Sequence, residues 1–531
     1  MFETGTATDY ADLIDKLNTF LTAKGSAFGL SYSGTGTGTL TDYSGGASSV
    51  AETFTITATS PTVFDVVGSV SGDIGDATVG TPFSHAKLEF TITAGGTAFI
   101  VGDEFVLSTA PKWTAHRKCL GCRVLADLGN TGTYGAQNMV DGKNEISSYK
   151  FRAEDPETPF DIEIEFFEAE TIHQYQLAMF LSSQYSYGPK AWTFDYWTGS
   201  AWSTLDSESG HDDWTQTAIK TFDVGSPVSA TKYRLHVTEL NTSSYLHIGA
   251  FRLLRSDGVD AAFSQTIWEA PGNDGDSEIL VGVHGFERQD ADYFDWEIAA
   301  FDGYLASALW REQTGFHGQL FVPLWDASIP YWFVADGRRV IVVAKISTQY
   351  EVAYLGFIDA YYTPEQMPYP IALGGSLTFD LPIPGWHDDD YRWSTATLEH
   401  SAFPISDYAD SGTGVDPTDY QMRLRSIDGT WIGFAARVAG GEVSMSSRDA
   451  MWPYCGGLDE LDVNLDGGYS LFPIMLNTLT PNTFGQLAGV ACVTGQGLTA
   501  ETLITKGSVD WLALHNIFRT ERDDWFAIAL D

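Results

Sequence analysis

Side chains with oxygen ligands recur at alternate positions in one short segment of the sequence. Asp462, Asn464 and Asp466 precede Gly467 in the order D-x-N-x-D-G, which is how a calcium-binding loop begins. The twelfth position of such a loop, where an EF-hand has a bidentate glutamate, is Pro473, so an EF-hand is excluded. The segment predicts either an isolated calcium site or a polar turn between strands.

Two further groups of reactive side chains lack the partners that their chemistry needs. Cys119 and Cys122 have the spacing of half a zinc site, but no second C-x-x-C or H-x-x-x-H follows, so ordinary thiols are expected. The run from His387 to Asp390 could bind a metal or supply paired glycosidase carboxylates, although a solvated loop is the simpler interpretation. Because the sequence has no G-x-S-x-G elbow and no phosphate loop, we do not expect an enzyme.

The charge and composition exclude several classes of protein. The chain has 29 basic and 70 acidic residues, a net charge of −41, so nucleic acid is not an expected partner. Its apolar runs are too short to cross a bilayer, and no basic region followed by an apolar stretch marks a secretory signal. We therefore expect synthesis in a cytoplasm and no membrane insertion.

The elements that must position these groups are mostly strands. With 53 glycines, 14% aromatic residues and 19% charged residues, the 531-residue chain suits sheets with glycine-rich turns. One amphipathic helix is predicted over 9–24, where Leu13, Ile14 and Leu17 share an apolar face and Asp9 can cap the N-terminus. Residues 34–46, rich in Gly, Thr and Ser, are predicted to be a loop or linker.

We predict a mainly β, multidomain fold. The expected units are an N-terminal helix (1–25) that docks on the C-terminal domain, a small β-module (26–112), a β-sandwich (113–255) and a large β-rich domain (256–531).

The middle unit carries a succession of aromatic strands. The quoted segments are Asn138-Met-Val-Asp-Gly142, the alternating Phe160–Phe166, Trp192–Trp197 followed by Gly199-Ser-Ala-Trp202, and Tyr233-Arg-Leu-His-Val237. This order resembles a discoidin-type, galactose-binding-like jelly roll. The resemblance implies a ligand patch on loop tips and a structural calcium near the early loops, for which Asp141 is the matching residue.

Three tryptophans of this unit are candidates for binding glycan. The faces of Trp197, Trp202 and Trp214 could stack on the C–H faces of sugar rings. The alternative is that the same rings fill the core of the sandwich or cover its end.

Other parts of the chain resemble structural proteins of tailed-phage particles. The resemblance rests on TGTATDYADLIDKLNTFLT at the start, on 64–107, on 329–370 and on the C-terminal 43 residues. It implies a virion component of the tail tip or baseplate that forms a homo-oligomer, contacts other tail proteins and reaches host surface polysaccharide. The alternatives are a receptor-binding adhesin and a tail-associated glycan hydrolase.

Overall fold

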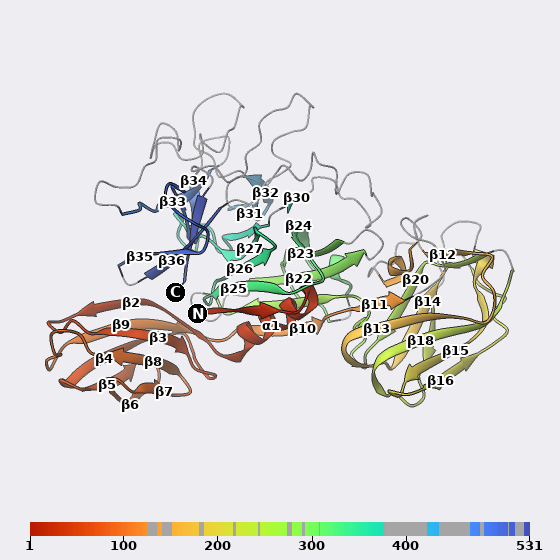
Figure 1. Cartoon of the computed structure of the whole chain (residues 1–531), viewed down its shortest axis with the longest axis horizontal. Helices are drawn as coiled ribbons and strands as arrows, with labels where there is room; N and C mark the ends of the chain where they lie inside the picture. Colours follow the sequence, from red (N-terminus) through yellow and green to blue (C-terminus); the bar gives the residue numbers. More distant parts are fainter. Residues whose placement is uncertain are drawn as a thin grey trace, which may run out of the picture.

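The fold is mainly β, as predicted, and its sheets form three groups in a row (Figure 1). The computed structural model describes residues 1–125, 135–140, 151–179, 185–215, 219–242, 245–272, 279–288, 293–306, 308–375, 377–378, 422–434, 468–477, 483–507, 509–515 and 525–530. The small β-module and the sandwich lie at opposite ends, and a larger group of sheets, here called the body, lies between them (Figure 1).

Helix α1 spans Tyr10–Ala23 and confirms the helix predicted from apolar spacing. Asp9 Oδ1 accepts a hydrogen bond from the backbone N of Asp12 at 2.8 Å, which caps the first turn. Trp296 of the body donates its Nε1–H to the backbone O of Tyr10 at 3.0 Å. The buried residues of α1 all belong to the core of the body; they are Tyr10, Ala11, Leu13, Ile14, Leu17, Phe20 and Leu21. Within the described ranges, no helix is long and apolar enough to span a bilayer.

The small β-module is built from a five-stranded sheet, in the order β2-β9-β4-β5-β6, and a three-stranded sheet, β3-β8-β7. Its strands are β2 (Ser26–Ser33), β3 (Thr39–Gly45), β4 (Glu52–Ser60), β5 (Val63–Gly68), β6 (Gly72–Thr78), β7 (Pro82–Ser84), β8 (Leu88–Thr93) and β9 (Glu104–Ala110). The predicted linker at 34–46 is wrong for most of its length, because β3 pairs there with β8. Leu40 and Tyr43 of β3 both pack on the module's core, because the register of β3 with β8 shifts between Thr41 and Ser44.

The sandwich packs a five-stranded sheet, β11-β13-β18-β15-β16, against a three-stranded sheet, β17-β14-β20, with β12 and β19 paired beside them. Its strands are β11 (Cys122–Leu125), β12 (Phe151–Glu154), β13 (Phe160–Thr171), β14 (Gln174–Ala178), β15 (Pro189–Trp197), β16 (Trp202–Glu208), β17 (Ile219–Asp223), β18 (Ser229–Leu240), β19 (Tyr245–Ile248) and β20 (Ala250–Leu254). The alternation that predicts β13 is realised: Ile162 and Ile164 are fully buried and face the second sheet's core residues.

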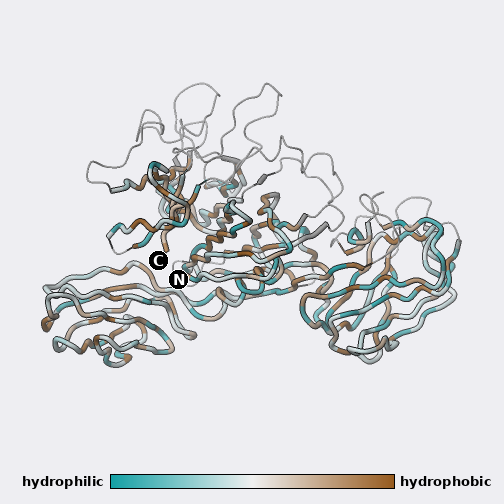
Figure 2. Tube along the Cα trace, in the orientation of Figure 1, coloured by the Kyte–Doolittle hydropathy of each residue, from teal (hydrophilic) through white to brown (hydrophobic). Residues whose placement is uncertain are grey.

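The body stacks three sheets. The first has the order β10-β21-β22-β23-β24-β30, the second β1-β25-β26-β27-β29-β31-β32, and the third β28-β34-β37-β36-β35 with β33 beside β34. The second sheet is buried on both faces, since one apolar face joins the core with α1 and the other packs on the third sheet. Hydrophobic stretches accordingly run through its strands (Figure 2).

The strands of the body come from both ends of the chain. They are β1 (Phe2–Ala7), β10 (Thr114–Cys119), β21 (Gln265–Ala270), β22 (Ile279–Arg288), β23 (Tyr293–Phe301), β24 (His317–Leu324), β25 (Ile329–Ala335), β26 (Arg339–Ile346), β27 (Gln349–Phe357), β28 (Asp359–Ala360), β29 (Ile371–Gly374), β30 (Leu377–Thr378), β31 (Met422–Arg425), β32 (Trp431–Phe434), β33 (Phe472–Asn477), β34 (Thr483–Val493), β35 (Thr502–Lys506), β36 (Val509–His515) and β37 (Trp525–Ala529).

Two neighbouring strands of the body join it to the sandwich. β10 leads into β11, and β20 leads back into β21, which pairs antiparallel with β10. The sandwich therefore begins near Cys122, later than the expected boundary at 113, because β10 belongs to the body's first sheet. Arg255 and Glu170 form a paired salt bridge at this joint, with Nε 2.7 Å from Oε2. Lys118 of β10 adds a contact at 3.0 Å to Glu168.

Candidate functional site

A pair of tryptophans flanks the turn between β15 and β16, at one edge of the five-stranded sheet. Trp197 and Trp202 are register partners, and their ring centres lie 5.3 Å apart at an interplanar angle of 64°. The turn is fixed locally, because the backbone N of Thr198 donates to the O of Ala201 at 2.9 Å and Gly199 has a φ of 93°. Both tryptophans are half-buried, so part of each ring reaches solvent.

Arg234 on β18 connects this pair to two carboxylates. Its guanidinium Cζ lies 4.7 Å from the centre of the Trp202 ring. Its Nε donates to Asp195 Oδ2 at 2.8 Å, and its Nη1 donates to Asp161 Oδ2 at 2.9 Å. The other oxygen of Asp161 lies 2.5 Å from Nδ1 of His236. We call the outward surface of Trp197, Trp202, Arg234, Asp161 and His236 the Trp–Arg face.

The strand alternation explains why these side chains share one side of the sheet. Tyr233 and Leu235 of β18 point into the sandwich core, so Arg234 and His236 point outward. Asp161 on β13 is the register partner of His236. The Trp–Arg face therefore combines aromatic ring surface with carboxylate, imidazole and guanidinium groups held in place by one another. Such a surface can contact the C–H faces of a polar ligand and also hydrogen-bond its hydroxyl groups.

Trp214 does not belong to this face, which corrects its prediction as a glycan-binding residue. Its side chain is only 3% exposed, and its Nε1 donates to the backbone O of Pro189 at 2.7 Å. Its ring centre lies 6.2 Å from that of Trp192 in the core, and Lys220 Nζ lies 4.3 Å from the same ring centre. The core interpretation is therefore the one that applies to Trp214.

The predicted calcium ligands Asp141, Asp462, Asn464 and Asp466 lie outside the described residues, as does the acidic run from His387 to Asp390. Calcium binding therefore stays a prediction. In the ranges that the structure describes, no group of three or more His, Cys, Asp or Glu side chains is arranged to hold a metal ion.

Cys119 and Cys122 are buried thiols at the joint between β10 and β11. Burial raises the pKa of the Cys119 thiol to about 12, which keeps it protonated at neutral pH. Cys122 Sγ donates to the backbone O of Ala262 at 3.3 Å. Both therefore act as small packing residues of the joint.

Sequence reasoning missed Arg234, Asp161 and His236, although part of the signal was present. The alternation in Tyr233-Arg-Leu-His-Val237 marks Arg234 and His236 as outward-facing. What alternation does not give is the pairing of β18 with both β13 and β15, which brings Asp161 and Asp195 to the same guanidinium.

No family model and no curated protein matches the chain. Part of the chain is similar to solved carbohydrate-binding modules. One is CBM32-1 from a family 31 glycoside hydrolase of Clostridium perfringens, with 17% identity, 26% of this chain and 96% of that one covered, and a TM-score of 0.23. Another is the family 32 module of Streptococcus pneumoniae EndoD, with 17% identity, 25% and 94% covered, and a TM-score of 0.22.

A third similar structure is CpGH89CBM32-5 from Clostridium perfringens, solved in complex with GalNAc-β-1,3-galactose. It has 16% identity and a TM-score of 0.19, and 26% of this chain and 91% of that chain are covered. All three likenesses involve about a quarter of this chain.

Proposed function

We propose that the sandwich binds glycan through the Trp–Arg face and that the body holds it in a fixed position. The observation that carries the proposal is the half-exposed Trp197–Trp202 pair, with the guanidinium of Arg234 over the Trp202 ring. A patch of exposed aromatic surface commonly marks a binding site, and tryptophan is enriched among the residues that dominate binding energy.

The polar part of the face suits a ligand with hydroxyl groups. Asp161 and His236 lie 2.5 Å apart beside Arg234, and their side chains are 32% and 27% exposed. A carboxylate accepts hydrogen bonds from hydroxyl groups, and imidazole and guanidinium donate to them. Since Arg234 is held by two carboxylates, the three groups are ordered before a ligand arrives, which lowers the entropy lost on binding.

The test is binding of the full-length chain to a glycan array, followed by calorimetry with the strongest ligand. We expect Trp202→Ala to weaken binding about thirtyfold, since a central tryptophan contributes about 2 kcal/mol. Trp325→Ala is the matched control, because Trp325 is a half-buried tryptophan of the body. Equal affinities of the Trp202 variant and the native chain would refute the proposal, as would a native chain that binds no glycan.

For the whole chain we propose a structural role in a tailed-phage virion, in the tail tip or baseplate, after synthesis in the host cytoplasm. The sequence resemblance at both ends supports this role, and β1, from the N-terminal end, pairs in the body with β25, which lies in the resembling segment 329–370. In this role the chain forms a homo-oligomer with other tail proteins and has no catalytic activity. Light scattering on the purified chain tests the role: a closed oligomer agrees with it.

Two other functions predict different results in the same experiments. A receptor-binding adhesin would bind host cells as an isolated monomer, with the Trp–Arg face as its main contact. A glycan hydrolase would release sugar from host polysaccharide, and substitution of a carboxylate pair would abolish that release. A monomer that binds host cells would replace the assembly role with the adhesin.

A further inference from the structure

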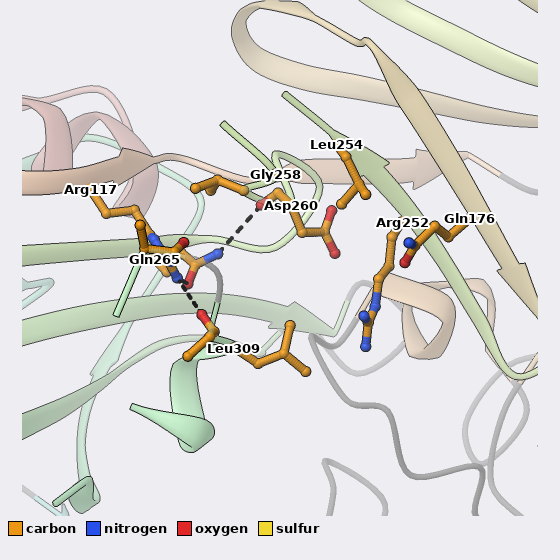
Figure 3. A pocket seen from close by; sticks show the side chains of 11 residues that line it. Arg117, Gln176, Arg252, Leu254, Gly258, Asp260, Gln265 and Leu309 are labelled. Carbon is orange, nitrogen blue, oxygen red and sulfur yellow. Dashed lines mark hydrogen bonds between the residues drawn. The ribbon is translucent and has the colours of Figure 1, made fainter. Parts of the chain in front are cut away.

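A cavity of about 150 Å³ lies in the joint between the sandwich and the body. Gln176 of β14 and Arg252 of β20 line it from the sandwich, and Arg117 of β10 and Gln265 of β21 line it from the body. Asp260 comes from the segment that connects β20 to β21. Its carboxylate points toward the side of the cavity on which Arg252 and Gln176 lie, while Arg117 and Gln265 lie on the other side (Figure 3).

Two polar atoms of this lining have no hydrogen-bond partner among the described residues. Arg117 is 5% exposed; its Nη1 donates to Ala308 O at 3.1 Å and its Nη2 to Ala306 O at 2.6 Å, but its Nε has no acceptor. Asp260 is 4% exposed; its Oδ1 accepts from two backbone N–H groups at 3.1 Å, but its Oδ2 has no donor. Buried polar groups are normally paired, so a ligand that pairs both atoms would be favoured.

We propose that the joint cavity binds a small oxyanion, a carboxylate or a phosphate, between Arg117, Arg252 and Asp260. Two arginines and one acid give the lining a positive charge, in a chain whose net charge is −41. Guanidinium groups bind carboxylate and phosphate with charge-assisted hydrogen bonds. A cavity of about 150 Å³ holds a molecule of roughly six non-hydrogen atoms, which fits acetate or inorganic phosphate.

Asp260 makes this site dependent on pH. Burial raises its pKa to about 6, against the opposing effect of Arg252 and Arg117, the charged groups that face it from β20 and β10. Cys119 of β10 also lies near, and its thiol is neutral. Below about pH 6 the Asp260 carboxyl carries a proton that it can donate to an oxyanion, whereas the ionised carboxylate repels the ligand.

The test is calorimetric titration of the full chain with sodium acetate and, separately, sodium phosphate, at constant ionic strength in chloride. Acetate should bind saturably at about pH 5.5 and about 25-fold more weakly at about pH 7.5, because the protonated fraction of Asp260 falls from about three-quarters to about 3%. Asp260→Asn keeps a donor at every pH, so its acetate affinity should be the same at both.

Arg252→Gln should weaken binding at least tenfold. Arg338→Gln is the matched control, because it removes the same charge from a hairpin turn of the body, and it should bind as the native chain does. Binding of acetate alone identifies a carboxylate ligand, and binding of phosphate alone identifies a phosphate. The proposal is overturned if neither acetate nor phosphate binds, or if the native chain and Arg252→Gln bind with equal affinity. If Arg252→Gln does not fold, the Asp260→Asn variant decides: acetate binding with the same pH dependence as in the native chain overturns the proposal.

Discussion

Replacing Asp260 with asparagine should stabilise the protein at neutral pH and have little effect in acid. Burial raises the pKa of this carboxyl from its usual 3.8 to about 6. A raised pKa means that the folded state holds its proton more tightly than the unfolded state, so the resulting stability is fully present below pH 3.8 and is lost as pH rises through about 6. A difference of about two pKa units corresponds to about 3 kcal/mol, because each unit is about 1.4 kcal/mol.

The assay is guanidinium unfolding at several pH values between about 4 and about 7.5, in cationic buffers without oxyanions. As pH rises from about 4 to about 7.5, the difference in free energy of unfolding between Asp260→Asn and the native chain should grow by about 2 to 3 kcal/mol in favour of the variant. Asp257→Asn, an exposed carboxylate in the same connection, controls for the loss of one negative charge. A constant difference between Asp260→Asn and the native chain at all pH values would show that Asp260 ionises freely in the fold and would refute the reasoning.

Three further predictions, made with four substitutions, test the packing. Leu17→Ala, in the fully buried face of α1, should cost about 2–5 kcal/mol in thermal unfolding, and a loss under about 1 kcal/mol would mean that α1 is not part of the body's core. Gly121→Ala should lower the free energy of unfolding more than Gly199→Ala does. Both glycines have positive φ, but only at Gly121 would the new Cβ lie 2.9 Å from the Ser264 backbone N. Equal losses of stability in the two variants would contradict that contact. Trp214→Phe should lower the melting temperature without changing glycan affinity, and weaker glycan binding would return Trp214 to the site.

The elements with a clear residue period could be predicted from sequence. The apolar spacing of Leu13 and Leu17 identified α1 almost to its ends, and alternation identified β13. The glycine-rich stretch that contains β3 was misread, because its threonines and serines pair with β8 in a contact that composition does not reveal. Local pattern gives an element's type, whereas tertiary pairing decides whether a weak strand forms.

The candidate site shows the same division. A turn of four residues separates Trp197 from Trp202 in the sequence, so the hairpin alone brings the two rings together. Arg234 reaches them through pairing of β15 with β18, over a separation that no local pattern specifies. Burial of Trp214 likewise depends on the sandwich closing around it. A sequence therefore identifies the aromatic part of this face more readily than the charged part.

The double connection between the sandwich and the body has a mechanical consequence. Both connections leave from the same end of one strand pair, since Cys119 at the end of β10 is the register partner of Gln265 at the start of β21. A force that pulls the sandwich along these strands is shared between them and is passed to β22, the next strand of the sheet. The hydrogen bonds between β21 and β22 are then loaded together in shear rather than broken one at a time. A ligand held by the sandwich would thus pull against a whole sheet of the body.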